Sequence, residues 1–128
     1  MAREVKKADV LKYMKQAEEF LAAAIQCFES ERYNAATFNA IQSMLNANDA
    51  LTISYLGQRA TSDHREALAL HAGVAKLLND TSQKSRLSQA LELRSEAGYG
   101  GGIMLESDAE KAIKNATRFF DWVKLNLK

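Results

Sequence analysis

The 128-residue sequence contains no proline, a single cysteine and few aromatic residues. Average proline usage near 5% would place about six prolines in a chain of this length. Proline interrupts helices because it lacks a backbone N–H donor and clashes with the preceding turn. A proline-free chain rich in Ala, Leu, Glu, Lys and Gln therefore favours long, uninterrupted helices.

Excess charge and long apolar runs are also absent. The formal net charge is +1, so the chain as a whole has no electrostatic attraction to nucleic acid or acidic membranes. Cys27 has no second cysteine with which to form an internal disulfide. No apolar run approaches the roughly 18 residues of a membrane span, and the N-terminus lacks the apolar segment of a secretion signal. We therefore expect a cytoplasmic protein that does not bind membranes.

The signatures of common metal and phosphate sites are missing too. Di-iron helical bundles require Glu-x-x-His on two helices, and no such motif occurs here. The glycine-rich stretch from Gly98 to Gly102 lacks the Lys-Ser/Thr of a phosphate-binding loop and follows no strand. We expect neither a metal nor a cofactor.

Apolar residues recur at helical spacing in five segments, and no segment alternates as a strand would. The length suits one domain with a sizeable core, spanning residues 1–128, with residues 1–8 as a flexible basic arm. The expected helices run from Asp9, as a cap, to about Ser30, from about Tyr33 to Leu56, from His64 to Leu78, from near Ser82 to Ala97, and from a capping box at Ser107–Glu110 almost to Lys128.

Short links between these helices favour antiparallel neighbours. The predicted fold class is all-α: a five-helix antiparallel up-and-down bundle with a four-helix core. Gly57 is suited to ending the second helix, because glycine adopts the left-handed conformation without strain.

The second helix is the least charged, and Asp49 is the only charged residue between Arg32 and Arg59. A helix that is apolar over most of its circumference is expected at the centre of a bundle, covered by its neighbours or by a second subunit. One polar stripe interrupts it, formed by Asn39, Gln42, Ser43 and Asn46 at helical spacing. The stripe either faces solvent or other helices as ordinary structure, or lines a cleft facing Arg94.

Arg94 occupies the last turn of the fourth predicted helix, just before the glycines, and Tyr99 follows five positions later. A guanidinium here could hold the turn by bonding carbonyls or a carboxylate. Alternatively, its planar fork could bind a phosphate. His64 and His71 lie seven residues apart on one side of the third helix, and either could be catalytic or structural.

Several segments together resemble a HEPN (higher eukaryote and prokaryote nucleotide-binding) domain, and in order they span almost the whole chain. They are Tyr13-Met-Lys-Gln-Ala-Glu-Glu-Phe-Leu and Glu31-Arg-Tyr-Asn-Ala-Ala in the first hairpin, Ser62-Asp-His-Arg at the third helix, Leu91-Glu-Leu-Arg-Ser-Glu-Ala-Gly-Tyr-Gly, and Asp108-Ala-Glu-Lys-Ala.

The resemblance implies an all-α bundle that commonly forms a homodimer. Many members are metal-independent ribonucleases with an Arg-x4-6-His motif, in which arginine holds the scissile phosphate and histidine transfers a proton. Arg94 matches that arginine, but Tyr99 stands where the histidine is expected and Gly100 follows. A phenol, with an ordinary pKa near 10, is a poor base at neutral pH. The incomplete motif therefore counts against an enzyme.

Three functional hypotheses follow from the resemblance and the residues. The first is a non-catalytic module, homodimeric through its second and fourth helices, that binds a nucleotide or RNA phosphate or partners a nucleotidyltransferase-type protein. Its expected ligand-binding residues are Arg94, Tyr99, Gly100, Asn39 and Asn46. The second is a ribonuclease or toxin that uses Arg94 with Tyr99, or with His64 or His71 brought near it. The third is a dimerising scaffold without a ligand.

Overall fold

The computed structural model describes residues 3–4, 7–61, 64–98 and 101–128. These residues form five α-helices in the predicted order, which confirms the all-α bundle. The helices are α1 (Val10–Glu29), α2 (Tyr33–Leu56), α3 (His64–Leu78), α4 (Lys84–Gly98) and α5 (Glu106–Asn126), with a short 3-10 turn, η1 (Lys7–Asp9), before α1. None of the helices in this part of the chain is both long and apolar enough to cross a bilayer.

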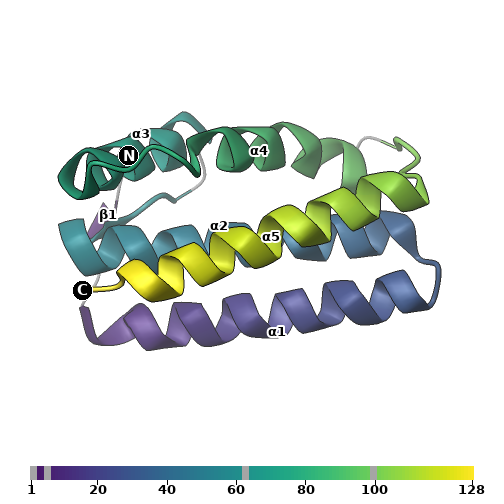
Figure 1. Ribbon diagram of the computed structural model, residues 1–128, viewed down its shortest axis with the longest axis horizontal. Coiled ribbons are helices and arrows are strands. Elements are labelled where there is room, and N and C mark those ends of the chain that lie inside the picture. The colour runs from purple at the N-terminus through teal and green to yellow at the C-terminus, as the bar shows by residue number, and fades with distance from the viewer. Residues whose placement is uncertain (1–2, 5–6, 62–63, 99–100) are drawn as a thin grey trace.

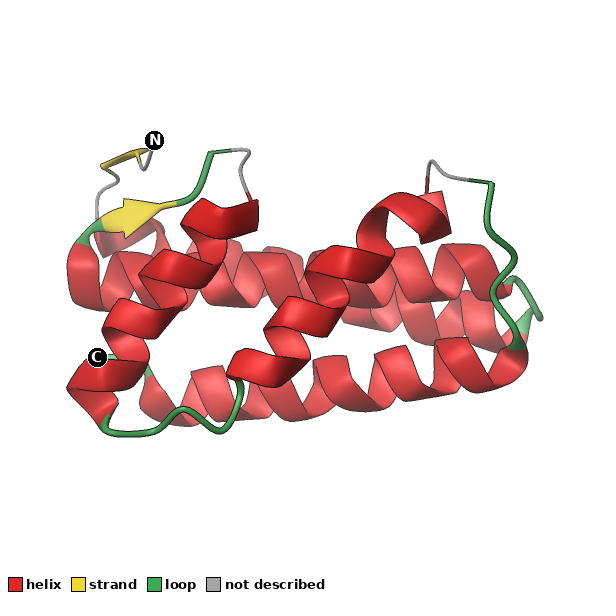
Figure 2. Cartoon of the chain, turned by 90° about the horizontal axis from the view of Figure 1, so that it is seen from above, coloured by secondary structure: helices red, strands yellow, loops and turns green. Residues whose placement is uncertain are grey.

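Helix α2 lies at the centre of the bundle. Figure 1 shows α1 along one side, α2 and α5 in the middle, and α3 and α4 along the opposite side. α2 packs against each of the other four helices, as its low charge predicted. Seen from above, the short helices α3 and α4 cross obliquely over the longer ones (Figure 2). The start of α3 and the end of α4 lie at the same edge of the molecule.

Small residues let the helices approach α2 closely. Ala40 and Ala47 on α2 are fully buried, as is Ala17 on α1. The buried Ser43 hydroxyl donates a hydrogen bond to the carbonyl oxygen of Ala17 at 2.7 Å. Such a bond satisfies a buried polar group while it ties α2 to α1.

Sequence rules located several helix ends correctly, including those of α2 and α3, and missed the start of α5. Gly57 ends α2 with φ 67°, and its N–H bonds the carbonyl of Ile53, as predicted. The expected cap at Ser107 is wrong, since α5 begins at Glu106. The Asp108 carboxylate accepts a hydrogen bond from the Leu105 N–H at 2.8 Å, so the cap lies two residues earlier. Asp9 is the N-cap residue of α1, as predicted, but it makes no side-chain capping bond and pairs with Lys12 instead.

The connection between α4 and α5 is fastened to α2 by Asn34. Its side-chain nitrogen donates to the carbonyl of Gly102 at 2.6 Å and to that of Ala97 at 3.3 Å. Its side-chain oxygen accepts from the N–H of Met104 at 2.9 Å. Gly98 adds a close approach, because a Cβ there would lie 2.6 Å from the ring of Phe38. The end of α4 is therefore held directly against the start of α2.

The N-terminal arm, which we expected to be flexible, contributes one short pairing. Strand β1 (Arg3–Glu4) runs antiparallel to β2 (Gln58–Arg59), with Arg3 opposite Arg59. Two-residue strands are too short to show an alternating pattern, so the sequence did not indicate them.

Candidate functional site

A pocket of about 400 Å³ opens between the start of α3 and the end of α4, above the middle of α2. Tyr13 and Gln16 of α1 and Arg59 of β2 complete its wall. Clefts of this size, with a few convergent polar groups, are the usual form of small-molecule sites. The residues of this pocket come from five different elements, so only the folded bundle assembles it.

Arg94 of α4 lines this pocket. Its Nε is buried and has no hydrogen-bond partner among the described residues. A buried donor without a partner costs roughly 1–3 kcal/mol, and a ligand that accepts its hydrogen bond would recover that cost. This arrangement favours the ligand-binding interpretation of Arg94 over that of a clamp for the glycine turn.

Arg59 supplies a second positive charge to the pocket. Its guanidinium carbon lies 5.7 Å from the centroid of the Tyr13 ring, and its Nη1 donates to the carbonyl of Ala60 at 3.1 Å. Two guanidinium groups in one pocket would favour an anionic ligand, since Arg binds phosphate and carboxylate oxygens through parallel N–H bonds.

Asp49 of α2 lines the same pocket, and its environment disfavours ionisation. Burial raises the pKa of Asp49 from 3.8 to about 7, while the positive charge of Arg59 opposes part of that rise. Strongly shifted carboxyl groups in clefts are concentrated at functional sites. This side chain can gain or lose a proton near neutral pH.

The polar stripe of α2 serves more than one purpose. Gln42 and Asn46 line the pocket with Arg94, whereas Asn39 does not. The Asn39 and Asn46 side chains each donate to the carbonyl four residues earlier on α2, at 2.8 Å. The side-chain oxygen of Gln42 is buried without a partner in the described residues. The stripe therefore includes members that line the pocket and one that does not, and its role in binding stays a prediction.

The two histidines of α3 have different surroundings. His64 lines the pocket together with Arg94. His71 is fully buried, and its Nδ1–H donates to the side-chain oxygen of Asn48 at 2.9 Å. Burial lowers the pKa of His71 to about 4, helped by the positive charge of Lys84 and opposed by Asp80. His71 is neutral near pH 7 and belongs to the core.

Tyr99 and Gly100, two of the predicted ligand-binding residues, lie outside the described residues. Their roles stay predictions. In the part of the chain that is described, no group of three or more His, Cys, Asp or Glu side chains is placed to hold a metal ion.

Sequence reasoning missed Asp49 and Arg59 as members of the site. The available signal was a lone charge in the least charged helix, with the next cation ten residues later. A charge on a central helix needs either a partner or a cavity, because burying it alone is costly. Asn48 was missed as well. It lines the pocket and bonds His71, and so links the pocket to the core.

A comparison with protein-family models identified a match that covers most of the chain. The HEPN domain model matches residues 10–126. The chain belongs to the HEPN family. A comparison with curated proteins returned no match. The resemblance drawn from the five sequence segments is thereby confirmed.

HEPN membership sets the general class of function, which is nucleotide-related or ribonuclease-like. The matched region contains α1 through α5, and with them the pocket at Arg94. HEPN membership alone does not name a ligand, so the chemistry of the pocket must supply that argument.

Proposed function

We propose that this HEPN domain binds a phosphate-bearing ligand, a nucleotide or an RNA, in the pocket at Arg94. The observation that carries the proposal is the buried, unpartnered Nε of Arg94, in a pocket that Arg59 also lines. Two guanidinium groups match the charge of a phosphate, and the pocket volume of about 400 Å³ suits a mononucleotide or one residue of an RNA.

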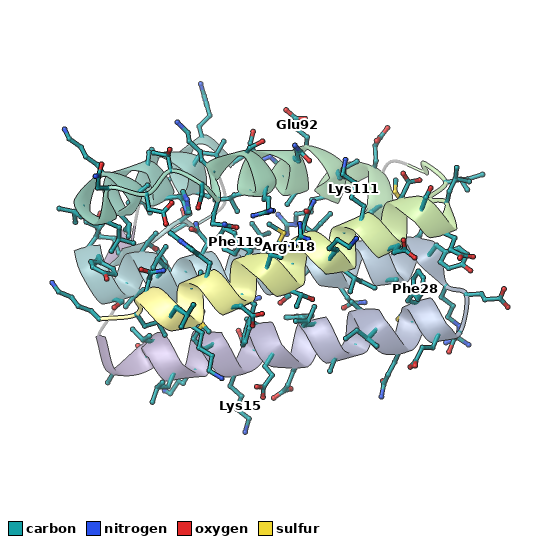
Figure 3. All side chains as sticks on the ribbon, in the orientation of Figure 1. Lys15, Phe28, Glu92, Lys111, Arg118 and Phe119 are labelled. Carbon is teal, nitrogen blue, oxygen red and sulfur yellow. The ribbon has the colours of Figure 1, made fainter. Side chains whose placement is uncertain are left out.

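Titration of the Arg94→Ala variant with 5′-nucleoside monophosphates and a short single-stranded RNA tests this function. Losing a charge-assisted, partly buried phosphate contact should weaken binding about 10- to 100-fold. Arg118→Ala is the matched control, because Arg118 is exposed on α5, outside the pocket (Figure 3). Equal affinities for the wild type and the Arg94 variant would remove the basis of the proposal.

A second candidate function is metal-independent RNA cleavage, and one observation favours it. His64 lines the same pocket as Arg94, so a proton-transferring group is available although Tyr99 replaces the motif histidine. In this reaction the 2′-hydroxyl oxygen would attack the phosphorus as a base removes its proton. The bond to the 5′-oxygen would break as an acid protonates that oxygen. The products are a 2′,3′-cyclic phosphate and a 5′-hydroxyl.

Incubation with labelled RNA in excess EDTA tests cleavage. If His64 takes part, His64→Gln should slow cleavage roughly 10²- to 10⁴-fold, the usual contribution of one general acid or base. A wild-type protein that binds RNA and leaves it intact would restrict the function to binding.

Partners are a separate part of the proposal. HEPN domains often dimerise, and we propose a homodimer for this chain. Its own helices cover α2, so the contact would fall mainly on α4, where Leu93 is 37% exposed. Sedimentation at tens of micromolar protein tests the dimer. A nucleotidyltransferase-type partner stays a prediction from the family resemblance.

A further inference from the structure

The pocket contains one charge of the wrong sign for a phosphate. Asp49 is the only carboxylate among the described residues that line it. Two like charges in close contact repel each other at the effective dielectric of a protein surface. A phosphate held by Arg94 would therefore lie away from Asp49, and a different part of the ligand must face this carboxyl group.

The α2 wall of the pocket offers hydrogen-bond acceptors. Asp49 lies seven residues after Gln42, two helical turns along the same face, and Asn46 lies between them. The Gln42 side-chain oxygen is buried without a partner in the described residues, and no described residue donates a hydrogen bond to the Asp49 carboxylate. Acceptors in a pocket that no protein group satisfies favour a ligand that donates hydrogen bonds.

The positively charged side chains of the pocket come from other elements: Arg94 from α4 and Arg59 from β2. Arg59 lies near enough to Asp49 to lower its pKa, whereas no such effect comes from Arg94. The pocket therefore combines an acceptor at Asp49 with a separate cation at Arg94. A ligand that fits both must carry N–H donors at one end and an anionic group at the other.

We infer that the ligand is a guanine nucleotide or an RNA guanosine, with Asp49 accepting hydrogen bonds from the base and Arg94 holding the phosphate. The inference rests on the proposed function and specifies its ligand. Guanine carries two adjacent donors, N1–H and the 2-amino group, which match the two oxygens of a carboxylate. Adenine and cytosine each place an acceptor beside their amino group, and uracil has a single N–H.

The ionisation of Asp49 adds a condition to this recognition. Burial raises its pKa to about 7, so at pH 8 most of the free protein has the carboxylate form that accepts two hydrogen bonds. The neutral form has one donor and one acceptor, a pattern that fits adenine or cytosine instead. Tyr13, His64, Arg59 and Arg94 are the other titratable or charged groups of the pocket.

Calorimetric titration of the full chain with GMP, IMP, AMP, CMP and UMP at pH 8 tests the inference. A bidentate contact to a base discriminates by about 1–3 kcal/mol, so GMP should bind roughly 10- to 100-fold more tightly than AMP. IMP lacks the 2-amino group and should fall between them. This series uses the wild-type protein alone, so it does not depend on how any variant folds.

Asp49→Asn should bring GMP to within about threefold of AMP, because an amide offers one donor and one acceptor. Glu92→Gln is the matched control, since it neutralises a carboxylate on the outer side of α4 (Figure 3) and should keep the preference for GMP.

Equal affinity for all five nucleotides, with loss of binding in Arg94→Ala, would overturn the guanine inference and leave phosphate binding in place. Retention of the GMP preference in Asp49→Asn would overturn the role of Asp49. Absence of binding by every nucleotide would overturn both this inference and nucleotide binding in the proposed function.

Discussion

Two regions that meet at α3 each contain one of the two histidines. His64 lines an open pocket, whereas His71 is buried in the core. The pocket includes Asp49, His64 and Arg94, and it is open to solvent. The second region, here called the aromatic cluster, consists of His71, Phe119 and Trp122. The His71 ring centroid lies 5.8 Å from those of both aromatic rings, and His71 and Phe119 have no exposed surface.

The surroundings of the polar groups distinguish the two regions more than residue types do. In the aromatic cluster, the Trp122 Nε1–H donates to Asp80 at 2.8 Å and the His71 Nδ1–H donates to Asn48. Buried atoms without a partner among the described residues occur in both regions: Arg94 Nε and Gln42 Oε1 in the pocket, and His71 Nε2 in the aromatic cluster. The comparison teaches that the aromatic cluster encloses its polar groups in the core, whereas the pocket leaves polar groups beside open space, where we propose that a ligand binds.

Phe119→Ala should give the largest loss of stability and so tests the structural role of the aromatic cluster. Removing a fully buried phenylalanine side chain costs about 3–5 kcal/mol, through lost burial and the cavity left behind. Phe28→Ala removes the same ring from a half-buried position on α1 and should cost less. Urea unfolding measures both free energies. Similar losses in the two variants would contradict a special role for the aromatic cluster.

The pH dependence of stability should separate the two histidines. His71 has its pKa lowered from 6.5 to about 4, so the unfolded chain takes up a proton more readily than the folded one. Its contribution is complete above pH 6.5 and is lost as the pH falls towards 4, by about 3 kcal/mol in total. Urea titrations across this range should show a smaller loss in His71→Gln.

His64→Gln is the paired control for that measurement, because it removes the other histidine of the same helix. The His64 variant retains His71, so it should keep the loss of stability that His71 causes as the pH falls below 6.5. If the free energy of unfolding changed with pH in the same way in both variants, the two histidines would not differ as the pocket and the aromatic cluster predict.

Asp49→Asn should give the smallest effect, and one of opposite sign. The raised pKa means that the unfolded chain releases its proton first, so stability is lost as the pH rises from 3.8 to about 7. The variant avoids this loss and should be about 2 kcal/mol more stable than the wild type at pH 8, less than the full shift implies because the pocket is open to solvent. The gain should vanish below pH 4. If the wild type were more stable than the variant at pH 8, the raised pKa of Asp49 would be contradicted.

The fold could be predicted because its determinants are local. Apolar spacing, the absence of proline and the glycine at position 57 together indicated five helices, and each predicted helix is present. The start of α5 was wrong because either Glu110 or Asp108 could supply the carboxylate of a capping box. The bond from the Leu105 N–H shows that Asp108 supplies it.

The site was only partly predictable because it depends on contacts between distant segments. Arg94 and Asn46 were identified from their chemistry and helical position, and they line one pocket. Arg59 and Asp49 line the same pocket because of how β2 and α2 meet. Helical spacing in the sequence does not predict that contact. Asn48 was hidden for the same reason, since its partner His71 lies 23 residues away on another helix.

The absence of a side chain at Gly98 has an evolutionary consequence. Because a methyl group there would press on the ring of Phe38, the two positions share one space. Related chains with alanine or serine at position 98 should carry a smaller residue at position 38, or else tilt the end of α4 outward. That tilt would displace the arginine one helical turn earlier, so this compact pair constrains which sequences can keep the pocket's shape.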